Sequence, residues 1–151
     1  MKITKKEIQE IILEEMKNIQ LEQILTEENA SMISKASSKE QLNEFITEAA
    51  LISGIVNVVY ILVKSYGMHK FWKLVWDPIV RMIWESDGSK MPDWAEAENN
   101  MFLDPFGFIK QFSKNIYSWF RGAPDKSQPP EDKLEKLKRL KAELEKKKQS
   151  L

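Results

Sequence analysis

The amino-acid sequence predicts an all-α protein, a small bundle of about five helices with an amphipathic first helix and a charged last helix projecting from it. Apolar residues recur at steps of three and four along most of the chain, which is the spacing of one helix face. Capping residues and Asp-Pro pairs separate these periodic segments. Only 5 Gly and 6 Pro occur among the 151 residues, too few for the turns of a many-stranded β protein.

The composition argues against most kinds of active site. The chain has no Cys and a single His, His69, so it offers neither a thiolate zinc site nor a cluster of imidazoles. No phosphate-binding loop, calcium loop or nucleophile-elbow motif is present. We therefore predict no catalytic residue, no cofactor and no metal, in a non-enzymatic protein. The balance of 23 basic and 23 acidic side chains argues against nucleic acid as the main partner.

The first 28 residues predict an amphipathic helix. Thr4 and Glu7 have the spacing of a capping box at its start. A polar, Ser-rich connector is expected over residues 29–38. The apolar stripe of the helix is a candidate interaction surface, formed by Ile8, Ile11, Ile12, Met16 and Ile19.

Residues 38–122 are expected to form the helical core. One helix begins at Ser38, with Gln41 as its capping partner, and ends before Gly67. Asp77-Pro78 divides the following segment into two short helices, 68–76 and 78–85, or kinks a single one. Asp104-Pro105 opens a further helix over residues 105–121, which Gly122 stops.

Residues 49–63 carry no formal charge, and this run leaves two interpretations open. A run of this length is shorter than the roughly 20 apolar residues of a usual membrane span, which favours the central helix of a soluble bundle. The alternative is insertion of residues 45–63 into a bilayer, since lysines and tryptophans follow as in a membrane-interface belt. The residues that would insert are Ile52, Val56, Val59 and Val63.

Aromatic residues form apolar faces on the helices expected after residue 67. Such faces pack against each other, dock on a partner protein or lie in a membrane interface, and mutual packing is the commonest outcome. The candidate interaction residues on these faces are Trp72, Trp76, Phe112 and Trp119.

The C-terminal part predicts a linker at residues 123–130, because its prolines favour extended backbone, and a charged helix at residues 131–151. The apolar stripe of that helix is narrow, and it includes Leu137 and Leu144 as candidate interaction residues. We expect this helix to be separable from the core and to serve an intermolecular contact.

The opening Met-Lys-Ile-Thr, followed by a helix of Ile, Leu, Glu and Lys, resembles the N-termini of many small proteins of tailed bacteriophages, especially marine ones. The resemblance covers about 25 residues of the chain. It implies a structural or accessory protein of the virion, present in the host cytoplasm during assembly, that docks on other virion proteins as a homo- or hetero-oligomer. The alternative is a small membrane-active protein, holin-like or a genome-ejection component, located in the bacterial membrane.

Overall fold

The computed structural model describes the chain except for residues 1–2, 87, 89–90, 97–104 and 122–129. The described residues are helical and contain no strand, which confirms the all-α class. Five of their helices have nine or more residues: α1 (Lys5–Ile33), α2 (Lys39–Tyr66), α4 (Asp77–Glu85), α6 (Pro105–Arg121) and α7 (Pro130–Gln149).

Helix α1 begins where the capping residues place it and ends later than expected. The Thr4 hydroxyl accepts a hydrogen bond from the Glu7 backbone N–H at 3.1 Å. The helix then continues through five residues of the predicted polar connector, as far as Ile33. The connector was predicted too long because tertiary contacts outweigh the low helix propensity of this stretch: Met32 is buried and Asn29 donates a hydrogen bond to Ser53 of α2.

Helix α2 has the predicted ends with a small change in its capping. The Ser38 hydroxyl accepts from the Gln41 backbone N–H, but the Gln41 side chain accepts from Ser37 instead of returning to Ser38. At the other end Gly67 has a φ of 81°, a left-handed conformation that glycine adopts without steric cost.

The segment after Gly67 is one continuous helical rod: α3 (Met68–Lys70), a π-helical turn η1 (Phe71–Trp76) and α4. The Asp77 N–H bonds to the carbonyl of Trp72, five residues back. Pro78 follows and has no N–H to give to Leu74, so the wider turn lies where an α-helical hydrogen bond is missing. A kinked single helix was one of the two arrangements expected from the sequence.

Helix α7 is part of the core, which corrects the prediction of a separable C-terminal helix. It packs on α2 and on α4, and Leu137, Leu140 and Leu144 have no exposed surface. Its first residue is Pro130, and the rest of the predicted linker lies outside the described residues.

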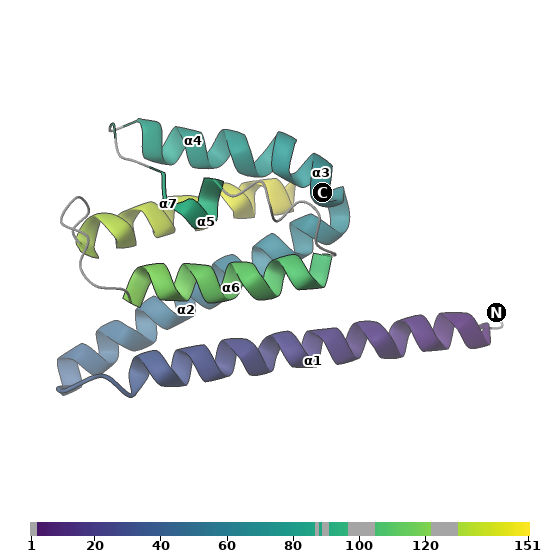
Figure 1. Ribbon diagram of the computed structural model, residues 1–151, viewed down its shortest axis with the longest axis horizontal. Coiled ribbons are helices and arrows are strands. Elements are labelled where there is room, and N and C mark those ends of the chain that lie inside the picture. Colours follow the sequence, from purple (N-terminus) through teal and green to yellow (C-terminus); the bar gives the residue numbers. More distant parts are fainter. Residues whose placement is uncertain (1–2, 87, 89–90, 97–104, 122–129) are drawn as a thin grey trace.

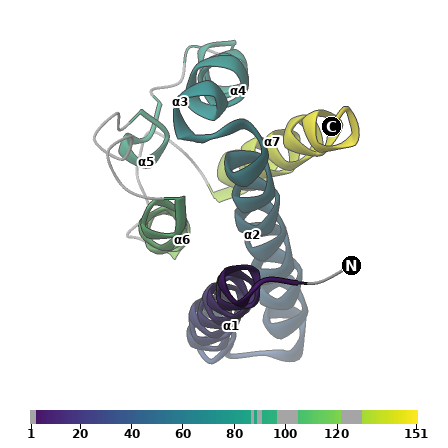
Figure 2. The ribbon, with the colours of Figure 1, turned by 90° about the vertical axis from the view of Figure 1, so that its right-hand side faces the viewer.

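Helix α2 occupies the centre of the bundle. In the view of Figure 2, α1 and α6 lie to the left of α2, α4 lies at the upper left, and α7 extends to the right. Helix α6 lies beside the C-terminal half of α1, whereas the N-terminal half of α1 extends past the other helices (Figure 1). The short helix α5 (Asp93–Glu96) covers the aromatic side of the core next to α6.

Candidate functional site on the first helix

The structure places most of the predicted aromatic and leucine docking residues inside the chain's own core. Trp72, Trp76 and Phe112 are buried, as are Leu137 and Leu144, while Trp119 is half-buried. As docking residues the buried five were predicted wrongly, because their apolar faces are already covered by neighbouring helices. Mutual packing, the commonest outcome for such faces, accounts for them.

All five tryptophans belong to one cluster, centred on a residue that the sequence analysis did not single out. Trp94 of α5 is 5% exposed, and its ring centroid lies 5.4 Å from that of Trp119, 5.7 Å from Trp84 and 6.1 Å from Trp76. Trp94 stands alone in an acidic, otherwise weakly apolar stretch, so no periodic signal points to it.

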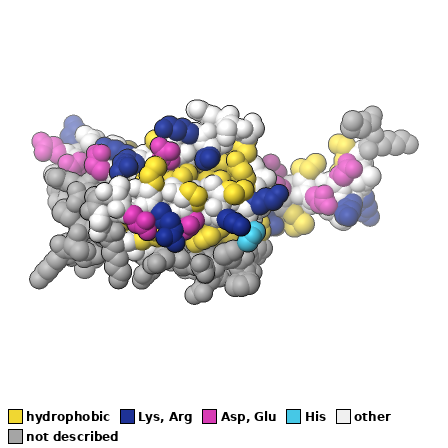
Figure 3. Space-filling view, turned by 90° about the horizontal axis from the view of Figure 1, so that it is seen from above, with side chains coloured by type: hydrophobic (Ala, Val, Ile, Leu, Met, Phe, Trp, Pro, Cys, Tyr) yellow, Lys and Arg dark blue, Asp and Glu magenta, His cyan; other side chains and the backbone are white. Residues whose placement is uncertain are grey.

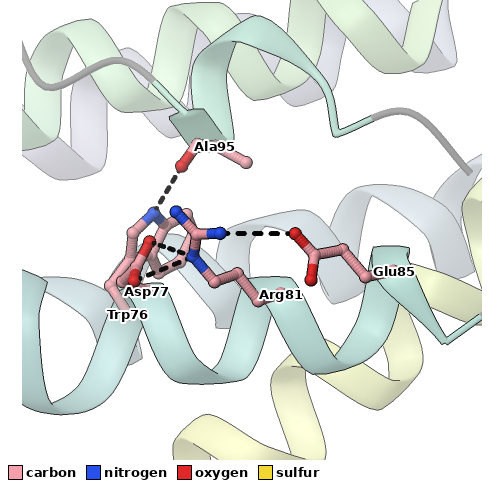
Figure 4. A network of polar contacts seen from close by, with 5 residues as sticks. All are labelled: Trp76, Asp77, Arg81, Glu85 and Ala95. Carbon is pink, nitrogen blue, oxygen red and sulfur yellow. Dashed lines mark hydrogen bonds and ion pairs between the residues drawn. The ribbon is translucent and has the colours of Figure 1, made fainter.

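A hydrogen bond ties α5 to the rod that carries Trp76. The Trp76 indole N–H donates to the carbonyl of Ala95 at 2.9 Å (Figure 4). On the outer face of the same rod, Arg81 lies between the carboxylates of Asp77 and Glu85. These exposed pairs stabilise the helix locally and form no site.

The residues proposed for membrane insertion lie in the centre of the bundle. Ile52, Val56, Val59 and Val63 have no exposed surface. Helix α2 is long and apolar enough to cross a membrane, and 56% of its most apolar window is buried inside the protein. In this fold its apolar surface therefore packs against helices of the same chain.

The stripe on α1 is the part of the predicted surface that remains open. We call Ile8, Ile11, Ile12, Met16 and Ile19 the α1 stripe; these five side chains are 47–55% exposed. Leu13 is also 56% exposed, but it points about 120° away from the stripe. In the view of Figure 3, this end of α1 projects from the body with hydrophobic and charged side chains on its surface.

The α1 stripe lies on a different face of the helix from the one that packs on the bundle. The packed face carries the buried Leu21, Leu25 and Met32, and Glu14 in line with them. At 100° per residue, the α1 stripe points about 130° away from this row. The stripe is therefore a second surface and does not extend the core.

Two sets of polar contacts hold α1 in this orientation. Glu14 pairs with Lys64 and accepts a hydrogen bond from the Tyr60 hydroxyl at 3.4 Å. Burial raises the pKa of Tyr60 above its ordinary value of 10.0, so the hydroxyl that donates to Glu14 stays protonated to a higher pH. Further along, the Asn29 side chain joins α2 and α6 through hydrogen bonds to Ser53 and Tyr117.

The exposed half of α1 has a polar face of balanced charge. Residues 5–19 contain four glutamates and three lysines, and one of the glutamates, Glu14, is already paired with α2. On the helical projection, Glu15 lies within the α1 stripe itself. With Glu14 turned toward α2, three glutamates and three lysines remain, so the exposed surface is apolar with balanced charge.

Nothing among the described residues resembles a metal-binding group: no cluster of three or more His, Cys, Asp or Glu side chains occurs there. His69 lies exposed in α3. The comparisons with known proteins gave no match, either to a protein-family model or to a curated protein or solved structure.

Proposed function

We propose that this chain is a non-enzymatic docking protein that binds other protein subunits through the α1 stripe. The supporting observation is a row of five large apolar side chains, each about half exposed, on a helical arm held clear of the bundle. Scattered apolar side chains are ordinary on protein surfaces, but a contiguous row marks an interaction site. The resemblance of the N-terminus to proteins of tailed phages supports a virion as the setting of this docking.

The charge of the arm favours a protein partner over a lipid surface. Helices that lie in an anionic membrane interface carry a basic polar face, whereas the face beside the α1 stripe has no basic excess. Insertion of residues 45–63 would require α2 to leave the bundle and expose its buried row. The protein-docking function therefore needs no rearrangement, and the membrane-active alternative needs a large one.

The strength of the contact follows from the area that remains open. Fully burying an Ile or Met side chain is worth about 1.5–3 kcal/mol, so covering the exposed half of five gives about 4–7 kcal/mol. Association itself costs an estimated 4–15 kcal/mol. A single stripe contact is thus weak and reversible, and it becomes stable where many copies bind to one particle.

The test is incorporation of the chain into particles of the phage that encodes it. Ile12→Glu puts a charge in the middle of the α1 stripe, and Leu74→Glu, at an exposed apolar side chain of η1, is the matched control. We expect both variants to melt at the wild-type temperature, and only Ile12→Glu to be lost from purified particles on an immunoblot. Wild-type copy numbers of the Ile12→Glu chain in particles would rule out docking through the stripe.

Adding lipid vesicles tests the alternative, membrane-active function. All five tryptophans lie in the cluster around Trp94, so their emission reports whether the bundle opens. A protein-docking chain keeps its emission maximum when anionic vesicles are added. A blue or red shift that persists at high salt, together with flotation of the chain, would instead support the membrane-active function.

A further inference from the structure

No other surface of the described residues matches the α1 stripe in extent. Apart from the stripe and its neighbours Ile3 and Leu13, the large apolar side chains that are exposed form no row: they are Ile46 and Ile61 in opposite halves of α2, Leu74 of η1, Met82 of α4 and the terminal Leu151. A second copy therefore offers one apolar surface of matching length, which is its own α1 stripe.

We propose that the partner of the α1 stripe is the same stripe of a second copy, paired antiparallel about Ile12; this inference rests on the docking function proposed above. Centred in this way, Ile8 lies at the level of Met16 of the second copy. The two Ile12 side chains meet at the two-fold axis. Such an isologous contact closes on itself and gives a dimer.

Charge favours the antiparallel direction over the parallel one. A parallel, in-register pair would set the two Glu15 carboxylates at the same level within the contact, and like charges there are destabilising. Antiparallel pairing places Glu15 opposite the uncharged Gln9 and separates the two Glu15 levels by about 9 Å along the axis. It also opposes the two helix dipoles.

The geometry leaves room for the second helix. The α1 stripe points about 130° from the buried row of Leu21, Leu25 and Met32, so a second helix approaches α1 from a different side than the bundle core does. Overlap of residues 5–19 spans about 22 Å, with the two bundles at opposite ends of the pair. The stripes offer roughly 500 Å² a copy and about 1,000 Å² together, which is near the lower limit for a specific interface.

The chain contains no Cys, so single cysteines can report the pairing directly. We would mix an affinity-tagged Ile8→Cys chain with an untagged Met16→Cys chain under mild oxidation and follow the mixed disulfide on a non-reducing gel. Antiparallel pairing predicts an efficient 8–16 bond and much slower 8–8 and 16–16 bonds, because a disulfide needs Cα atoms about 4.4–6.8 Å apart. Dominant 8–8 and 16–16 bonds would overturn the antiparallel arrangement.

Sedimentation of the chains without cysteine supplies the independent readout. The wild-type chain and Leu74→Glu should show a concentration-dependent dimer, and Ile12→Glu should weaken the dimer at least tenfold while keeping its helical circular dichroism. A wild-type chain that stays monomeric at the highest attainable concentration overturns the self-pairing. Loss of the Ile12→Glu chain from particles would in that case still support docking through the stripe on another protein. Failure of the self-pairing can therefore be told apart from failure of the docking function.

Discussion

The hydroxyl of Tyr117 lies 2.9 Å from the hydroxyl of Ser53, and this contact joins α6 to the centre of α2. The Tyr117 hydroxyl also donates to the side-chain carbonyl of Asn29. The side-chain NH2 of Asn29 in turn donates to the Ser53 hydroxyl at 2.8 Å. The three side chains form a closed ring of hydrogen bonds among α1, α2 and α6. The ring fixes the part of α1 from which the exposed arm extends.

Removing the Tyr117 hydroxyl from this ring of hydrogen bonds should destabilise the fold moderately. Tyr117→Phe keeps the buried aromatic ring but leaves Asn29 and Ser53 each with an unmade bond, and we expect a loss of about 1–3 kcal/mol in the free energy of unfolding. Urea denaturation measures it. Tyr66→Phe, at a half-buried tyrosine outside the ring, is the control and should change little. Equal stability of the Tyr117→Phe and wild-type chains would show that the ring contributes nothing.

Truncation of α7 should unfold the chain. Leu137, Leu140 and Leu144 are completely buried, and each Leu→Ala change in a core costs about 2–5 kcal/mol. The summed loss of all three leucines is comparable to the whole free energy of unfolding of a typical domain, which is about 5–15 kcal/mol. Leu140→Ala should therefore melt well below wild type, whereas Leu151→Ala, at an exposed end, should not. A chain ending at residue 122 that still melts cooperatively would restore the separable tail.

Glu48 gives the stability a defined pH dependence. Burial, with a smaller contribution from the neighbouring Glu44, raises the pKa of the Glu48 carboxyl above its ordinary value. A raised carboxyl pKa stabilises the fold below the ordinary pKa, and this contribution is lost as the pH rises through the raised value. Glu48→Gln stays uncharged, so at pH 7 it should be the more stable chain.

Because Glu48 is only half-buried, solvent screening keeps the gain small. The difference from wild type should shrink as the pH is lowered toward 4.5, the ordinary value. Thermal melts at several pH values measure it, with Glu10→Gln on the exposed arm as the control. A difference that grows on acidification would contradict the assigned direction of the shift.

Trp94 should contribute strongly to the free energy of unfolding, because it lies at the centre of the aromatic cluster. Trp94→Ala empties the middle of the aromatic cluster and should cost about 3–5 kcal/mol. Trp94→Phe should cost clearly less, because the buried indole N–H of Trp94 has no hydrogen-bond partner among the described residues and its removal strands nothing. Unfolding in urea followed by far-ultraviolet circular dichroism separates the two. Equal losses in both variants would mean that the cluster depends on the indole itself.

The sequence by itself determined where the main helices begin and, for α2, where it ends. Thr4 and Ser38 cap α1 and α2 through bonds to residues three positions away, and Gly67 ends α2 through its own backbone conformation. These signals are local, since each involves residues within one turn of the chain. Helix class and most boundaries could therefore be predicted without knowing which helices meet.

The tertiary structure alone decided which apolar stripes are covered. The row with Trp72 and Trp76, the leucines of α7 and the α1 stripe all have the same three-and-four spacing, yet the first two are buried and the third is exposed. The periodicity gives only the width of an apolar face, whereas burial depends on which elements pack against it. The packed row of α1 includes Glu14 and Asn29, whose partners Lys64 and Tyr117 lie far along the chain. Because those polar contacts turn this row toward the bundle, the more apolar face of α1 is left outside.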